Sequence, residues 1–324
     1  RLDEWWPPSG GMMSPGTFDN VNDGRRDRDA LFVEWEGRRD KRWILLAGAR
    51  YERVRSNAGE VRGYDPTTNG MGMMASYQKR DADAFNAANR ERTDGNWDAA
   101  ALVRYSPGDT LDLEAGLARK VRSPNLYQRY TWSTWSMAAV MNNTVGDGNG
   151  YIGNLSLEPE TARTLTATLD WHAADRSWEL RFTPYLTQVA DFIDAIQWNA
   201  ATNAPATTLA TGQFVVLKYL NQSARLRGFD LSGKALLAKT AMGDFGTSGT
   251  FSWVDGTNRD TGEDLYGIMP RNARLALTHA KGDWSGGIEV ALVARKDGLS
   301  DARNEIATSG YGLLHLRGSW RLAS

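Results

Sequence analysis

Apolar and polar residues alternate along most of this chain. The clearest example is the segment 111–117, in which Leu111, Leu113 and Leu117 alternate with Asp112 and Glu114. Strict alternation places apolar side chains on one face of a β-strand and polar side chains on the other. The pattern therefore predicts strands that have one apolar and one polar face.

About eleven such segments follow one another, and the connections between them differ in length in a regular order. Residues 1–29 are predicted to form a loop, because Pro, Gly and Asp interrupt any period there. The later connections alternate in length: short ones at 37–42, 106–109, 172–177, 238–243 and 280–283, and long ones at 55–94, 122–162, 198–213, 255–267 and 296–309. In a meander of antiparallel strands, this order puts the short turns at one end and the long loops at the other.

The asymmetry predicts an all-β fold, a transmembrane antiparallel β-barrel, in which periplasmic turns are tight and extracellular loops are long. No apolar run approaches the ~18 residues of a membrane-spanning helix. Backbone groups cannot stay unpaired in lipid, so a spanning sheet has to close on itself. About eleven strands would leave two open edges. We therefore expect residues 1–324 to be one portion of a larger barrel, truncated at both ends.

The phase of the alternation predicts which side chains face the membrane lipid. Polar residues between them, such as Asp112, are expected to face the lumen. The predicted lipid-facing residues are Leu111, Leu113, Leu117, Leu165, Leu169, Leu180, Phe182, Leu275, Leu277, Ile288, Val290 and Leu292.

Composition agrees with a barrel and excludes several other classes. The 13 Trp, 11 Tyr and 33 Gly suit strands with interfacial aromatic side chains and tight turns. The 38 basic and 39 acidic residues give a net charge of −1, which predicts no nucleic-acid partner. The chain has no Cys, and the sequence contains none of the hydrolase, metalloprotease or nucleotide-binding motifs. We therefore predict that it is not an enzyme and requires no cofactor.

The segment 122–162 is too long and too aromatic for a simple connection, which predicts a functional loop carried on the strands. The turn order places it on the extracellular side, where it would help to form a vestibule for the transported solute. The candidate substrate-binding residues in it are Tyr130, Trp132, Trp135, Asn142 and Asn143. His172 and His279 lie at strand ends and are expected at the membrane interface and not on a metal.

Methionine is unevenly distributed along the chain. Seven of the nine Met lie in three predicted loops, and a thioether is a soft ligand that suits Cu(I). The candidate metal ligands are Met71, Met73, Met74, Met137 and Met141, whereas Met12 and Met13 lie in the predicted N-terminal loop. The alternative is that these Met pack with Trp132 and Trp135 in a small apolar core between the loops.

Two motifs carry a resemblance to a known family. The segments RSPNLYQ at 122–128 and GNLSLEPET at 153–161 resemble RxPNLYE and GNPxLxPE of the TonB-dependent outer-membrane receptors. Gln128 stands where the family usually has Glu, and Leu155 stands where it usually has Pro. The segments 130–135 and 145–151 resemble the copper-receptor branch of that family.

The resemblance implies the C-terminal part of a barrel of ~22 strands around a plugged lumen, with the plug domain absent from these residues. It implies a receptor in the outer membrane of a Gram-negative bacterium. Such a receptor binds a scarce solute, here a copper ion, and imports it with energy that the TonB complex of the inner membrane supplies through the plug. The alternatives are a receptor for a siderophore or another metal chelate, a passive porin, and a soluble β-rich adhesin.

Overall fold

The computed structural model describes residues 1–7, 17–64 and 73–322, and these residues are mostly β-strand. The long strands are β2 (Phe18–Arg39), β3 (Trp43–Asn57), β4 (Arg92–Gly108), β5 (Leu111–Arg122), β7 (Glu160–His172), β8 (Trp178–Asn199), β10 (Val216–Thr240), β11 (Gly243–Asn258), β12 (Asn272–Lys281), β13 (Trp284–Val293) and β14 (Tyr311–Trp320). The shorter elements are β1 (Leu2–Trp6), β6 (Gly150–Ile152), β9 (Ala204–Pro205), α1 (Met73–Ala87), α2 (Leu126–Tyr130), α3 (Ser136–Met141) and η2 (Asp301–Arg303).

The strands form one sheet in which each long strand pairs with the next one along the chain. The order is β1-β2-β3-β4-β5-β7-β8-β10-β11-β12-β13-β14, and all of these pairs are antiparallel. In addition, β6 pairs parallel to the start of β10, and β9 pairs with β8. Among the described residues, no helix is both long and apolar enough to cross a membrane.

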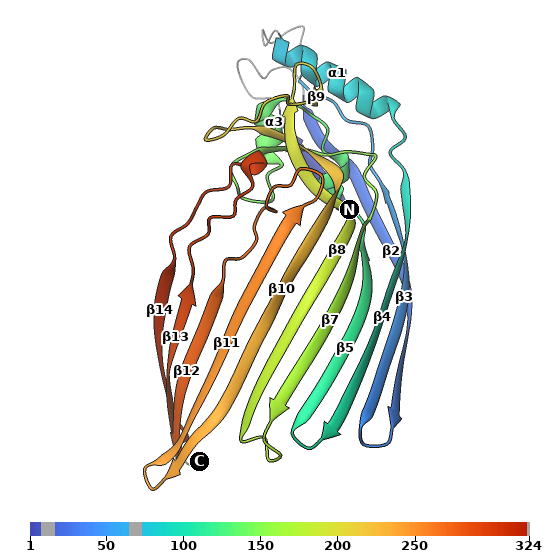
Figure 1. The fold of residues 1–324 in the computed structure, drawn as a ribbon. Coiled ribbons are helices and arrows are strands. Elements are labelled where there is room, and N and C mark those ends of the chain that lie inside the picture. The colour runs from blue at the N-terminus through green and yellow to red at the C-terminus, as the bar shows by residue number, and fades with distance from the viewer. Residues whose placement is uncertain (8–16, 65–72, 323–324) are drawn as a thin grey trace.

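The short turns lie together at one end of the sheet, and the long connections lie at the other, as the sequence pattern predicts (Figure 1). The helices and η2 all belong to the long connections. The predicted all-β barrel fold with turns of alternating length is therefore confirmed.

The prediction of a loop over residues 1–29 is wrong. Residues 2–6 form β1, and β2 begins at Phe18, eleven residues before the predicted end of the loop. This part of β2 continues beyond the apolar part of the sheet, where the outer face does not border lipid. Polar side chains then occupy both faces, so the alternation disappears although the backbone ladder with β3 continues.

The register assigns each residue to one face of the sheet, because directly opposed residues of neighbouring strands point the same way. Leu117 lies opposite Leu165, and their side chains are 63% and 52% exposed. Asp112 lies opposite Asp170, and these are 8% and 1% exposed. All twelve residues predicted to face lipid lie on the face of Leu117, which confirms the predicted register.

Aromatic side chains mark both edges of the apolar outer face. Trp43 packs on Tyr105 near the short turns, with ring centroids 4.4 Å apart, and Tyr51 packs on Trp97 near the long loops, at 4.8 Å. Each strand carries its two aromatic residues eight positions apart, about 26 Å along the strand at ~3.3 Å per residue. At a tilt of ~40° this corresponds to about 20 Å of depth, close to the ~25 Å apolar band of outer-membrane barrels.

A charge in the middle of this band is expected to be costly. Leu117 lies opposite Ala101, which is four residues from Trp97 and four from Tyr105 on β4. Leu117→Arg should lower the free energy of unfolding by ~2–4 kcal/mol, because the guanidinium would be placed in lipid. Unfolding in urea from lipid vesicles measures this.

The matched control is Ala118→Arg, at the neighbouring position on the lumen face, where water is present and the cost should be small. Asp112 is a poor control, because its carboxylate already binds Arg176. Equal costs at positions 117 and 118 would contradict the assignment of the faces.

Candidate functional site

The candidate site lies at the long-loop end of the sheet, where residues 122–162 fold into helices instead of an irregular loop. Helix α2 begins after Pro124 with a capping box: Asn125 Oδ1 accepts a hydrogen bond from the Gln128 backbone N–H at 2.8 Å, and Gln128 Oε1 accepts one from the Asn125 N–H at 3.0 Å. This arrangement satisfies backbone donors that a helix start leaves unpaired. The Asn and Gln of the first motif thus start the helix.

The two sequence motifs meet at the base of this loop. Arg122 binds both carboxylate oxygens of Glu160, at 2.7 and 2.9 Å. The backbone N–H groups of Gly153 and Asn154 donate to the carbonyl oxygens of Thr131 and Gln128, at 2.9 and 2.8 Å. The motifs therefore close the loop on itself, and their role in this structure is architectural.

A buried ion pair fixes α2 to the sheet. The side chain of Arg129 is fully buried, and its Nη2 lies 2.8 Å from Asp94 Oδ1 on β4. The same guanidinium donates to the Leu157 carbonyl at 2.9 Å and to Ser56 Oγ on β3 at 3.0 Å. A charge can be buried in this way only because its partner and its hydrogen bonds replace water. Arg129 therefore holds both ends of the loop against β3 and β4.

The predicted aromatic binding residues are buried in a cluster that spans several segments. Trp132 stacks on Phe18 at 5.1 Å, Phe18 stacks on Trp6 at 4.7 Å, and Trp135 meets the edge of Tyr64 at 5.9 Å. The indole N–H of Trp132 donates to the Asp19 carbonyl at 3.0 Å. Trp132 and Trp135 therefore pack residues 122–162 against β1, β2 and the segment after β3.

Tyr130 and Asn142 are also buried and engaged. The hydroxyl of Tyr130 donates to the Arg90 carbonyl at 2.9 Å and lies 3.0 Å from Ser56 Oγ. Asn142 accepts a hydrogen bond from Asn20 at 2.5 Å and donates to the Tyr151 carbonyl at 3.2 Å. Asn143 is half-buried and organises a turn, because its Oδ1 accepts from the backbone N–H groups of residues 145 and 146.

Two of the candidate methionines are exposed side by side. Met137 and Met141 lie on α3 four residues apart, so they share one face of the helix. Their side chains are 47% and 50% exposed, whereas Ala138 and Ala139 are completely buried. Neither Met belongs to the buried cluster that contains Trp132 and Trp135.

The remaining candidate ligands are less well defined. Met71, together with Met12 and Met13, lies outside the described residues. Met73 and Met74 begin helix α1, and only their backbone is described. Among the described residues, no group of three or more His, Asp or Glu side chains could hold a metal ion.

A second buried ion pair, absent from the sequence predictions, joins the later loops to the first. Arg303 on η2 places its Nη2 2.7 Å from Asp194 Oδ1 on β8 and its Nη1 3.3 Å from the hydroxyl of Tyr151 on β6. The backbone carbonyl of Arg303 accepts a hydrogen bond from Asn149 at 2.7 Å. Burial raises the pKa of the Tyr151 phenol, which also donates to Asp147. This group of side chains, centred on Arg303, is called the loop clasp below.

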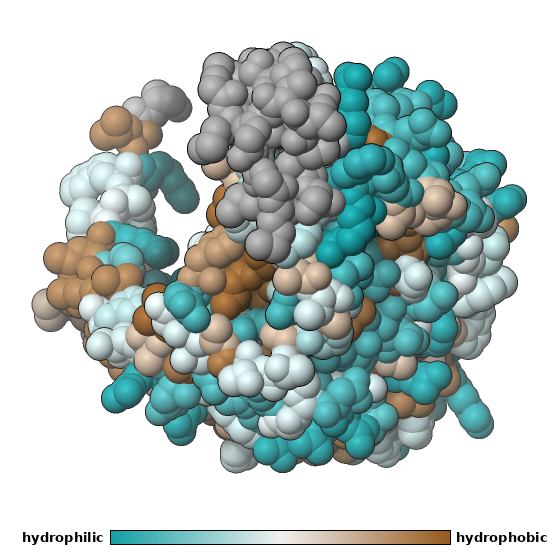
Figure 2. Space-filling view, turned by 90° about the horizontal axis from the view of Figure 1, so that it is seen from above, coloured by the Kyte–Doolittle hydropathy of each residue, from teal (hydrophilic) through white to brown (hydrophobic). Residues whose placement is uncertain are grey.

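Figure 2 shows this end of the molecule from above, with hydrophilic residues over most of the loop surface and apolar residues between them. On the left of this view, a wall of residues is separated from the main body by an open space. The described loops thus cover one side of the hollow that the sheet encloses.

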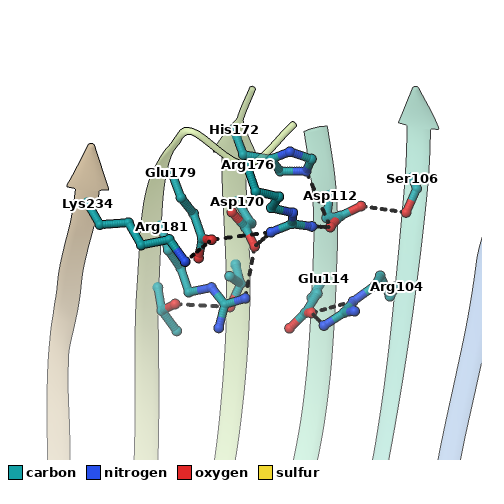
Figure 3. Close-up of polar contacts among 12 residues, drawn as sticks. Arg104, Ser106, Asp112, Glu114, Asp170, His172, Arg176, Glu179, Arg181 and Lys234 are labelled. Carbon is teal, nitrogen blue, oxygen red and sulfur yellow. Dashed lines mark hydrogen bonds and ion pairs between the residues drawn. The ribbon is translucent and has the colours of Figure 1, made fainter. Parts of the chain in front are cut away.

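The opposite end of the lumen carries a network of charged side chains near the short turns (Figure 3). Asp170 accepts hydrogen bonds from Arg181 at 2.8 Å and from Arg176 at 3.5 Å, and Arg176 also binds Asp112 at 3.1 Å. These side chains lie on the face opposite to the lipid-facing residues. They rigidify the turn end of the wall by linking β5, β7 and β8.

His172 belongs to this network and not to the membrane interface, where it was predicted. The imidazole is buried on the lumen face, with Nδ1 2.8 Å from the Ala173 carbonyl and Nε2 3.7 Å from Asp112 Oδ2. The residue follows Trp171, which points outwards, and the alternation turns it inwards. His279 lies with its Nε2 2.8 Å from the Met242 carbonyl at the next short turn.

The comparisons with known proteins agree with this architecture. A family model described as "TonB dependent receptor-like, beta-barrel" matches residues 3–324. No curated protein sequence matches the chain.

Solved structures with the same fold include a protein described as "Copper transporter OprC", with 19% identity and a TM-score of 0.67 over 95% of this chain and 41% of that chain. The siderophore receptor PirA from Acinetobacter baumannii gives 13% identity and a TM-score of 0.54 over 95% and 49% of the two chains. The Serratia marcescens hemophore receptor HasR, in complex with HasA and heme, gives 16% identity and a TM-score of 0.60 over 93% and 46%. At these identities the likeness shows the fold, and the chain spans less than half of each protein.

Proposed function

Because the chain belongs to the TonB-dependent receptor β-barrel family, we propose that it forms barrel wall and extracellular loops of a receptor that imports copper. Members of this family are transporters of the Gram-negative outer membrane, and this chain is an outer-membrane protein. The solved relatives include proteins named as copper, siderophore and hemophore receptors, so the family leaves the cargo open.

The observation that carries the copper assignment is the exposed pair Met137 and Met141. A half-exposed Met gains little from packing, yet Met137 and Met141 both lie on the exposed face of α3. The opposite face of this helix, with Ala138 and Ala139, is completely buried. Thioether sulfur prefers soft ions such as Cu(I) over the hard ferric ion of a siderophore complex. The name of the copper transporter among the solved relatives agrees with this assignment.

The same proposal includes the rest of the barrel and the energy source. In the described residues the sheet runs from β1 to β14 without pairing these two edges. Unpaired strand edges are not tolerated in lipid, so we infer that these strands are part of a larger closed barrel. Family members use TonB for transport, and we expect a plug that responds to TonB inside this barrel.

Replacing Met137 and Met141 with Leu should weaken Cu(I) binding by the full-length receptor at least tenfold, about 1.4 kcal/mol. Leu keeps the volume and apolar character of Met but removes the sulfur, so the change tests ligation and not packing. Competition with a Cu(I) chelator measures the affinity, and uptake in cells with and without TonB measures transport.

The matched control is Met242→Leu, at an exposed Met in the short turn between β10 and β11, which should leave binding unchanged. A second variant with Leu at 71, 73 and 74 shows whether Met71, Met73 and Met74 contribute further sulfur ligands. Unchanged binding and uptake in both loop variants would contradict the copper assignment. Copper uptake that persists without TonB would indicate a passive porin.

A further inference from the structure

The outer wall carries a row of arginines near the long-loop end of its apolar band. Arg119 on β5 lies directly opposite Arg163 on β7, Arg163 lies opposite Gln188 on β8, and Gln188 lies opposite Arg225 on β10. The strands that carry this row are neighbours in the sheet (Figure 1). The side chains belong to the lipid-facing side, because Leu117 and Leu165 occupy the next outward positions on the same strands.

The row has unbalanced positive charge. Like charges directly opposite each other on neighbouring strands are destabilising. Within the described residues, no carboxylate lies within 4 Å of Arg119, Arg163 or Arg225. By contrast Arg227, one outward position further into the membrane, is neutralised by Asp255 at 2.8 Å. An uncompensated arginine pair is retained at a cost, and a bound anion would offset it.

The arginines also have hydrogen-bond donors to spare. Arg163 is exposed and makes no side-chain hydrogen bond to the described residues. The side chain of the half-buried Arg225 likewise makes no hydrogen bond to the described residues, although its Nε is itself buried. Arg119 uses one Nη to donate to the Trp97 carbonyl, which fixes the position of its guanidinium.

An apolar groove lies directly below the row. The small side chains of Ala99 and Ala101 leave space between the larger Leu117, Leu165 and Leu186, and Arg119, Arg163 and Gln188 line the upper edge of the groove. Arginine above an apolar channel offers a place for a charged headgroup and for the acyl chain attached to it.

We propose that this surface binds a glycolipid with two phosphates in the outer leaflet of the outer membrane. Arg119 and Arg163 bind one phosphate, because the planar guanidinium matches the oxygens of a phosphate. Arg225 lies two strands further on, ~10 Å from Arg163 at ~4.8 Å per strand, and binds the second phosphate. Gln188 lies between them, where its amide can bind sugar hydroxyls. The long loops place the row at the extracellular side, which selects the outer leaflet.

The test is lipid retention by the full-length receptor, measured by native mass spectrometry during a titration with bisphosphorylated lipid A. Arg119→Gln combined with Arg163→Gln should weaken binding at least tenfold, because Gln keeps much of the length and the hydrogen-bonding capacity but loses the charge. Arg227→Gln, the matched control at the neutralised arginine, should retain wild-type binding. Copper uptake and the shift of the folded barrel on unheated gels should be unchanged in all variants.

Two further lipids distinguish the source of the phosphate. Lipid A without phosphates and phosphatidylglycerol, which has one, should each bind at least tenfold more weakly than the bisphosphorylated form. The proposal would be overturned if the unphosphorylated lipid or phosphatidylglycerol bound as tightly as bisphosphorylated lipid A. It would also be overturned if the Arg227 variant lost as much binding as the Arg119 and Arg163 double variant. Wild-type retention by the double variant would also overturn it.

Discussion

Replacing Arg129 with Leu is expected to destabilise the packing of residues 122–162 by about 3–5 kcal/mol. The substitution would leave the carboxylate of Asp94 buried without its partner, and Ser56 and the Leu157 carbonyl would lose donors. The barrel strands are held by their own ladders, so the effect should be local. Hydrogen exchange of α2 and of the segment before β7 measures it.

Two comparison variants make this expectation specific. Arg122→Leu removes the exposed ion pair with Glu160 at the base of the same loop and should cost no more than about 1 kcal/mol. Adding Asp94→Leu to Arg129→Leu should recover most of the loss, because a buried pair can be exchanged for apolar residues. Equal exchange rates in the Arg122 and Arg129 variants would show that the buried pair does not hold the loop.

Replacing Arg303 with Leu should open the loop clasp at a similar cost, about 3–5 kcal/mol. Asp194 would stay buried without its cation, and Tyr151 would lose the donor at its hydroxyl. Because the clasp joins η2 to β6 and β8, the segment 296–309 should separate from the other loops. Limited proteolysis should cut this segment faster in the variant than in the wild type.

The control for the clasp is Arg55→Leu, which removes an ion pair with Asp29 that is exposed on both sides and should have little effect.

The clasp should also respond to alkaline pH. Burial raises the pKa of Tyr151 above its ordinary value, so the folded loop favours the protonated phenol. This contribution is complete below the unfolded pKa of about 10 and is lost as the pH rises above it. Protection of the segment 296–309 that does not differ between the Arg303 variant and the wild type would contradict the clasp.

The sequence alone determined the strands, their faces and the two ends of the sheet. Each of these features depends on local pattern: a period of two sets the face of Leu117 and of Asp112, and Pro or Gly at a turn ends a strand. The alternation of short and long connections followed from the same pattern. The period of two did not predict the start of β2, because a strand that extends beyond the lipid no longer needs an apolar face.

The sequence also located the important loop but did not show what its residues do. The two motifs in residues 122–162 are recognisable because they are local, and in the structure they start α2 and close the base of the loop. Whether an aromatic residue in a polar loop binds a ligand or packs depends on its partners. Trp132 stacks on Phe18, which lies more than a hundred residues earlier in the chain, and no local pattern in the sequence predicts that contact.

Only the tertiary structure decided which charges are buried and which methionines are free. Asp194 and Arg303 are 109 residues apart, and each looks like an ordinary polar loop or strand residue until the chain folds. The sequence already made Met137 and Met141 candidate ligands, but only the structure shows that α3 buries Ala138 and Ala139 and leaves these two thioethers half-exposed. The arginine row emerged in the same way, since only the register of four strands places Arg119, Arg163 and Arg225 in one row, with Gln188 between the last two. Periodicity reports the environment of each strand, whereas pairing between distant segments depends on the whole fold.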